Sequence, residues 1–146
     1  MRFFNFLLIA LFLNSPGNWE TDFEHAKEIA KQQHKFILLN FSGSDWCGPC
    51  IRLNDEYFEI AMFKEFADSS LVLLNADFPR KKKHQLSKEQ QKKNDQLAEQ
   101  FNPHGIFPCT LLLDKEGKLL FTWEGFPDIS PAHFISQAKI LMNARE

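Results

Sequence analysis

The chain has few cysteines, few glycines and almost no net charge. Only three cysteines occur in 146 residues, too few for the disulfide-rich scaffold of a small secreted protein. A formal charge of −2 at pH 7 gives no overall basic field, so composition does not indicate binding to nucleic acid. No repeat is visible, and no apolar run reaches the ~20 residues that a membrane-spanning helix needs. The chain does have 44% hydrophobic residues, including 16 phenylalanines, which is enough for one domain with an aromatic-rich core.

Residues 1–17 differ in character from the rest of the chain. Arg2 precedes an apolar run from Phe3 to Leu13, and Ser15 and Gly17 follow as small residues. This order is typical of a secretory signal peptide. We therefore expect a signal peptide at residues 1–17 and a single domain at residues 18–146. An uncleaved anchor and a buried amphipathic start are the alternatives.

Apolar periodicity in the remaining residues predicts an α/β protein. The almost unbroken apolar run Phe36–Phe41 is expected of a central strand covered on both faces, and Leu71–Leu74 is a second such run. Thr110–Leu113 and Lys118–Trp123, joined by a turn at Asp114–Gly117, predict a hairpin. Helical spacing predicts helices over Trp19–Gln33 with Thr21 or Asp22 as N-cap, from about Cys50 to Phe66, after a cap at Ser87, and over Pro131–Met142.

One short motif between the first strand and the following helix carries the chemistry. It consists of Trp46, Cys47, Gly48, Pro49 and Cys50. At a helix start, unpaired N–H groups stabilise a thiolate and so lower the pKa of a cysteine below that of a free one. Proline fits the first helical turn. Two cysteines one helical turn apart can close and reopen a small disulfide. The motif therefore predicts a dithiol–disulfide exchange centre, with a zinc site as the alternative for a bare pair of this spacing.

The motif, and the strand and helix around it, resemble the active site of the thioredoxin family over about residues 19–142. The resemblance implies the thioredoxin fold, an α/β fold with a mixed central β-sheet flanked by helices on both faces. It implies that Cys47 attacks a substrate disulfide and that Cys50 resolves the mixed disulfide. The implied partners are protein disulfides and a redox partner that reduces or oxidises the pair. No cofactor is implied, and we expect a monomer.

The same resemblance assigns supporting roles to residues around the dithiol. Trp46 would cover the thiols, while Gly48 and Pro49 would set the loop geometry and bias the redox potential towards that of a reductase. Pro108 matches the family's cis-proline, which faces the disulfide. Phe107 would lend its backbone to an extended substrate segment.

The chain also departs from the family pattern. Thioredoxins usually carry a buried aspartate late in the strand before the motif, where this chain has Asn40. Because an amide cannot act as a base, either water or another carboxylate such as Asp45 relays the proton to the resolving thiol, or exchange is slower. The loop of residues 41–45 resembles exported bacterial thioredoxin-like proteins, so we expect a periplasmic location.

The third cysteine leaves other interpretations open. Cys109 is either a third redox thiol or, as we expect, a small apolar filler at the head of a buried strand. A metal site made of Cys47, Cys50, Cys109 and His104 is conceivable, but the spacing matches no common zinc pattern, so we expect no metal. A module that binds peptides in a Phe107–Pro108 groove, with incidental redox activity, is a further alternative.

Residues 80–100 form the most polar stretch, with seven Lys and Arg against three Asp and Glu. Such a stretch is either a docking surface for an acidic partner or a solvated helix face that follows a loop. Clustered lysines are common on exposed helices. We therefore expect the solvated face.

Overall fold

The structure is a computed structural model that describes residues 18–145. The predicted signal peptide at residues 1–17 lies outside the described residues. Among residues 18–145, no helix is long and apolar enough to cross a membrane.

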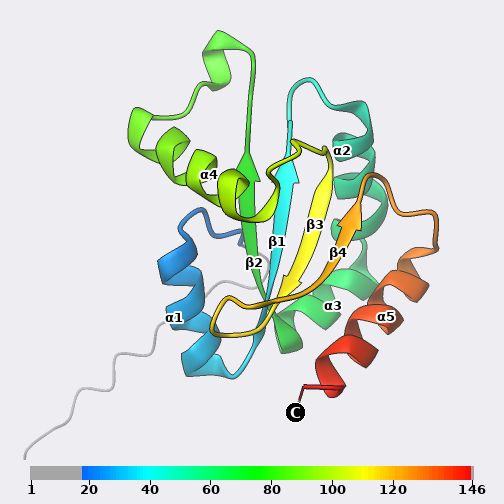
Figure 1. Cartoon of the computed structure of the whole chain (residues 1–146). Coiled ribbons are helices and arrows are strands. Elements are labelled where there is room, and N and C mark those ends of the chain that lie inside the picture. Colours follow the sequence, from blue (N-terminus) through cyan, green and yellow to red (C-terminus); the bar gives the residue numbers. More distant parts are fainter. Residues whose placement is uncertain (1–17, 146) are drawn as a thin grey trace, which may run out of the picture.

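A four-stranded mixed sheet forms the centre of the fold (Figure 1). Its strands are β1 (Phe36–Ser42), β2 (Leu71–Asp77), β3 (Cys109–Leu113) and β4 (Leu119–Glu124), in the order β2-β1-β3-β4. β1 runs parallel to β2 and antiparallel to β3, and β3 and β4 form an antiparallel hairpin. The first predicted strand is therefore an interior strand, as expected, and the predicted hairpin is confirmed.

Helices cover both faces of the sheet (Figure 1). They are α1 (Phe23–Gln33), α2 (Gly48–Leu53), α3 (Ala61–Ser70), α4 (Lys88–Phe101) and α5 (Pro131–Asn143). Alternate residues of β1 serve the two faces: Leu38 packs in the core with α2, α3 and α5, whereas Ile37 and Leu39 pack with α1 and α4. This arrangement confirms the thioredoxin fold.

Local sequence signals place the starts of two helices and the hairpin turn. Asp22 accepts a hydrogen bond from the N–H of His25 (3.0 Å), and Ser87 caps α4 in the same way through the N–H of Gln90 (3.1 Å). Both caps were expected, since a side-chain oxygen there satisfies an otherwise free N–H. In the turn at 114–117, Gly117 has a φ of +87°, a conformation that glycine adopts without steric cost.

The first helix begins later than predicted. It starts at Phe23, and the residues before it pair with the free edge of β2. There the N–H of Glu20 donates to Leu73 O (2.8 Å), and the carbonyl of Glu20 accepts from Asn75 N–H (2.9 Å). Trp19 therefore does not share a face with the α1 residues. Its ring packs on Phe58, with centroids 5.3 Å apart, on the opposite side of the sheet. The prediction failed because the edge of β2 offered backbone partners that local spacing does not reveal.

The long helix predicted from about Cys50 to Phe66 is interrupted. After α2 the chain makes a π-helical segment, η1 (Asn54–Phe58), in which Glu59 N–H donates to Asn54 O (2.9 Å). Ile60 is then extended, and α3 begins at Ala61. Tyr57 and Phe58 of this segment are both buried, in the core formed with α3 and α5.

Candidate active site

The two motif cysteines are joined at the start of α2. Cys47 is the N-cap residue, with an extended backbone, and Pro49 lies in the first turn. The sulfur atoms of Cys47 and Cys50 form a disulfide bond, and Cys50 N–H also points at Cys47 Sγ (3.3 Å). That N–H stabilises negative charge on the Cys47 sulfur when the disulfide opens. The predicted pairing and its position at a helix tip are both present in the structure.

The two cysteines have nearly the same exposure. Cys47 is 5% exposed and Cys50 is 3% exposed, so Cys47 is the more open by only a small margin in the disulfide form. Gly48 and Pro49 between them are exposed. The accessible edge of the motif is therefore its Gly48–Pro49 side.

Trp46 is held in place by contacts on several sides. Its indole Nε1–H donates to Phe78 O (2.7 Å), and its ring meets that of Phe107 edge-on at 5.6 Å. The guanidinium of Arg80 lies 3.6 Å from the ring centroid, in cation–π geometry. A Cβ on Gly43 would lie 2.3 Å from the indole, so only glycine leaves room for this ring. Trp46 thus joins the motif to two other segments of the chain.

The Phe107–Pro108 peptide bond is cis, as the resemblance implied. Pro108 is buried, and its carbonyl accepts from Gly125 N–H (2.8 Å). The Phe107 ring packs edge-on against Phe78 (5.5 Å) as well as against Trp46. The predicted substrate-binding residues and the dithiol motif therefore lie side by side, joined by aromatic contacts.

Asp45 anchors the segment that follows β2. Its carboxylate accepts from Arg80 N–H (2.9 Å), Lys81 N–H (3.0 Å) and the imidazole Nδ1 of His84 (2.9 Å). These hydrogen bonds, above all that from Arg80, lower the pKa of Asp45 to about 2. Asp45 therefore fixes residues 80–84, and its hydrogen bonds go to this segment and not to Cys50.

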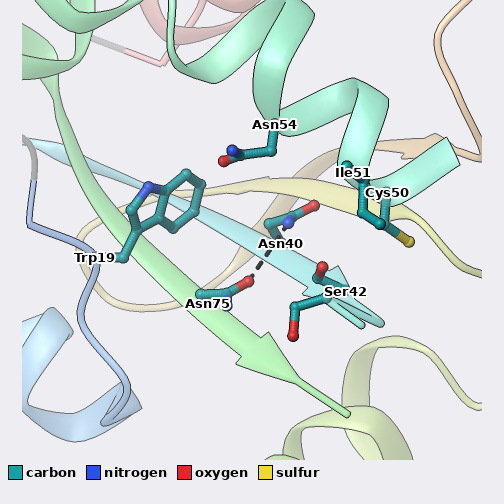
Figure 2. Close-up of a pocket in the computed structure, with 8 residues that line it drawn as sticks. Trp19, Asn40, Ser42, Cys50, Ile51, Asn54 and Asn75 are labelled. Carbon is teal, nitrogen blue, oxygen red and sulfur yellow. Dashed lines mark hydrogen bonds between the residues drawn. The ribbon is translucent and has the colours of Figure 1, made fainter. Parts of the chain in front are cut away.

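A polar pocket of about 330 Å³ lies beneath α2, next to Cys50 (Figure 2). Asn40 and Asn75 point toward one another from neighbouring strands, and Asn40 Nδ2 donates to Asn75 Oδ1 (3.4 Å). Thr110 Oγ1 donates to Asn40 Oδ1 (3.1 Å). The pocket lining is made of amide, hydroxyl and apolar groups, chiefly Trp19, Asn40, Ser42, Cys50, Asn54 and Asn75. These neutral groups can hydrogen-bond water but cannot take up a proton near neutral pH.

Cys109 lies on the other side of the sheet from α2, in the core formed with α1 and α4. It is 2% exposed, and burial raises its pKa to about 11, so it stays a thiol at neutral pH. This environment fits an apolar filler. Within residues 18–145 no three His, Cys, Asp or Glu side chains gather as metal ligands, so His104 and Cys109 do not join the motif cysteines.

Sequence reasoning missed the part that the end of β2 plays. Asp77 accepts from the N–H (2.9 Å) and hydroxyl (2.5 Å) of Ser44, and Phe78 and Arg80 contact Trp46. Since β1 and β2 are parallel, their carboxyl ends lie at the same edge of the sheet. The polar residues that follow β2 could therefore have been placed beside the motif from the strand order alone.

Comparisons with known proteins agree with this geometry. A family profile described as thioredoxin-like matches residues 18–115. The chain is 39% identical over 127 residues to the disulfide bond reductase DsbH of Chlamydia pneumoniae, covering 87% of this chain and 74% of that protein. It is 27% identical over 103 residues to the thioredoxin-related protein DsbJ of the same organism, covering 70% of this chain and 29% of DsbJ.

Solved structures give the same result. The structure of a DsbH oxidoreductase superposes with a TM-score of 0.78 at 34% identity, covering 97% of this chain and 95% of the other. A thioredoxin from Thermus thermophilus superposes with a TM-score of 0.65 at 12% identity, covering 87% and 88%, and so shares the fold. The matched residues include the strand, the dithiol motif and the helix that carry the site, and the chain belongs to the thioredoxin-like family.

Proposed function

We propose that this protein is a thiol–disulfide oxidoreductase that reduces or exchanges disulfides of exported proteins. The observation that carries the proposal is the Cys47–Cys50 pair at the tip of α2, beside the cis Phe107–Pro108 bond. The related protein DsbH of Chlamydia pneumoniae is a disulfide bond reductase by name, which supports the same activity here.

In the reducing direction, the Cys47 thiolate attacks one sulfur of a substrate disulfide and releases the other as a thiolate, which takes up a proton. The Cys50 thiolate, formed when its proton passes to solvent, then attacks Cys47 Sγ in the mixed disulfide. The substrate leaves as a dithiol, and Cys47 and Cys50 are left joined. Two electrons have moved to the substrate, and a separate dithiol partner must return them to the pair.

The surrounding residues suit these steps. Cys50 N–H, 3.3 Å from Cys47 Sγ, supports the attacking thiolate, and Trp46 shields the pair. Phe107 and Pro108 lie beside the motif, where an extended substrate segment would bind. The polar pocket next to Cys50 provides a path on which water accepts the Cys50 proton, in place of the carboxylate that Asn40 lacks.

We further propose that the protein acts as a reductase in a bacterial periplasm, as a monomer. The Gly48–Pro49 pair between the cysteines supports reduction, and the resemblance of residues 1–17 to a signal peptide supports export. Outside the reducing cytosol, such a reductase depends on a redox partner for electrons.

The test is reduction of insulin by dithiothreitol, followed as turbidity. The Cys47→Ser variant is expected to lose catalysis, whereas Cys109→Ser is expected to retain it as the matched thiol control. Cys50→Ala is expected to trap a mixed disulfide between Cys47 and a substrate, seen as a mass increase that dithiothreitol removes. Undiminished turnover by Cys47→Ser would contradict the proposal and leave the peptide-binding alternative.

A further inference from the structure

Five consecutive residues after β2, Arg80 to His84, form an exposed basic segment, which we call the basic loop. It includes the short 3₁₀ turn η2 (Lys82–His84) and leads into α4. In Figure 1 this loop lies at the same end of the sheet as the start of α2. The sequence predicted a loop followed by a solvated helix face over residues 80–100, without placing that loop beside the dithiol motif.

The charge of the basic loop contrasts with that of the chain as a whole. Residues 78–88 contain five of the 17 Lys and Arg and none of the 19 Asp and Glu. The rest of the chain therefore has an excess of acidic residues. Within the described residues, the side chains of Arg80, Lys81, Lys82 and Lys83 form no ion pair with the chain itself.

The basic loop is fixed to the dithiol motif. Asp45, two residues before Cys47, holds the N–H groups of Arg80 and Lys81 and the imidazole of His84. Arg80 also lies on the ring of Trp46 at 3.6 Å, and Trp46 in turn packs against Phe107. Because the Asp45 carboxylate is used by backbone N–H groups and His84, the lysine ammonium groups remain free for a partner.

We propose that the basic loop binds acidic side chains next to the disulfide of a polypeptide substrate, and so sets a preference for acidic-flanked disulfides. The inference rests on the oxidoreductase function proposed above and names the substrate class of that site. A substrate attacked by Cys47 lies beside Trp46, and its flanking residues then come within reach of Lys82 and Lys83. Opposite charge at that position raises the rate of productive encounter and lowers the free energy of the bound complex.

A charged patch of this size on an otherwise acidic protein does not suit a nucleic-acid backbone, which would be repelled by the remaining surface. The loop is also attached to the dithiol motif through Asp45 and Trp46, so a molecule that reaches the dithiol also comes close to the loop. These two observations favour a disulfide-bearing polypeptide.

The test compares three disulfides reduced by the full chain, with dithiothreitol as the electron donor and its uncatalysed rate subtracted: two peptides with the same single cystine, flanked either by glutamates or by lysines, and neutral 2-hydroxyethyl disulfide. The wild-type protein is expected to show a higher kcat/KM for the glutamate peptide, and this preference is expected to shrink from about 0.05 M to about 0.5 M NaCl because salt screens exposed charges. The Lys82→Glu/Lys83→Glu variant is expected to lose about three- to tenfold in kcat/KM for the glutamate peptide. Its rate with 2-hydroxyethyl disulfide is expected to stay unchanged.

The matched control is Lys115→Glu/Lys118→Glu, which makes the same charge change at exposed positions of the β3–β4 turn. It is expected to keep the wild-type preference. Equal kcat/KM for the two peptides in the wild-type protein, or an equal loss in both double variants, would overturn the inference. If the substrate preference is absent but reduction of 2-hydroxyethyl disulfide still depends on Cys47, the oxidoreductase function stands and only the role of the basic loop is wrong. If that reduction does not depend on Cys47, the oxidoreductase function itself is wrong.

Discussion

At the scale of single residues, the strand before the motif lacks the carboxylate that the family resemblance implied. Asn40 occupies the strand position where the family resemblance implied an aspartate, and its amide is paired with Asn75 and Thr110. It is 7% exposed. A carboxylate introduced there would be desolvated, which favours its neutral form and raises its pKa.

We therefore expect Asn40→Asp to make stability pH-dependent. With a folded-state pKa above the unfolded value of ~3.9, the folded protein binds the extra proton more tightly, so stability relative to wild type falls as pH rises from about 4 to the raised pKa. Urea unfolding at pH 4 and pH 7 measures this. Asn18→Asp, at an exposed position, is the control and should show no such difference. An equal effect of Asn40→Asp at both pH values would contradict the prediction.

The second residue-scale prediction concerns Asp45, whose pKa is lowered to about 2. A lowered carboxyl pKa stabilises the attached loop above the unfolded value of ~3.9, and this contribution is lost as pH falls towards 2. Amide exchange or NMR shifts of Arg80 and Lys81 should therefore change between about pH 4 and pH 2. In Asp45→Asn this titration step should be absent, and the loop amides should exchange faster at pH 7. Unchanged exchange in the variant would show that the carboxylate does not hold the loop.

At the scale of elements, the β1–α2 connection depends on the absence of a side chain at Gly43. Gly43→Ala would place a Cβ 2.3 Å from Trp46 Cε2, so the indole has to move. We expect a loss of about 1–3 kcal/mol in the free energy of unfolding, measured with urea. The control is Gly48→Ala, where nothing lies within 4 Å of the new Cβ. Equal unfolding midpoints for Gly43→Ala and wild type would refute this account of Trp46.

The π-helical segment η1 is tied to the chain before α5. The Tyr57 hydroxyl donates to Pro127 O (3.1 Å) and to Ile129 O, and its ring packs edge-on against Phe134. Tyr57→Phe keeps the ring and removes the donor, leaving carbonyls without their partner. We expect a loss of about 1–2 kcal/mol in thermal or urea unfolding. A variant as stable as wild type would mean that the ring alone fixes this segment.

At the scale of the whole molecule, the fold brings together a dithiol, a cis-proline segment and a basic loop at one end of the sheet. Parallel pairing of β1 and β2 places their carboxyl ends together. Because β3 runs antiparallel to β1, the start of β3, which directly follows Pro108, lies at the same end. The dithiol, the cis Phe107–Pro108 bond and the basic loop therefore lie at one end of the sheet.

The redox potential is the whole-molecule property that decides direction. With Gly48 and Pro49 between the cysteines, we expect the Cys47–Cys50 couple to lie near the thioredoxin value of about −270 mV and not near that of DsbA, about −120 mV. Equilibration with dithiothreitol or glutathione buffers, read by thiol alkylation and mass, measures it. Cys109→Ser removes the third thiol from the readout. A value near −120 mV would indicate an oxidant and contradict the proposed reductase role.

Much of the fold and the core of the site could be predicted from sequence because their signals are local. The apolar run before Trp46, the helix caps at Asp22 and Ser87 and the turn ending at Gly117 each act within a few residues. The dithiol is equally local, since one helical turn separates its two sulfur atoms.

Local sequence patterns thus predicted the α/β fold and the reactive pair, and the family resemblance implied the cis-proline at Pro108. The tertiary structure alone decided the features whose partners lie far along the chain: Trp19 on Phe58, the π turn at Tyr57, the Asn40 network and the attachment of residues 80–84 to Asp45. These depend on which strand edges and cavities the folded chain leaves open, and residue spacing carries no information about that. The same holds for the basic loop, because its lysines are visible in the sequence but its position beside the dithiol motif is not.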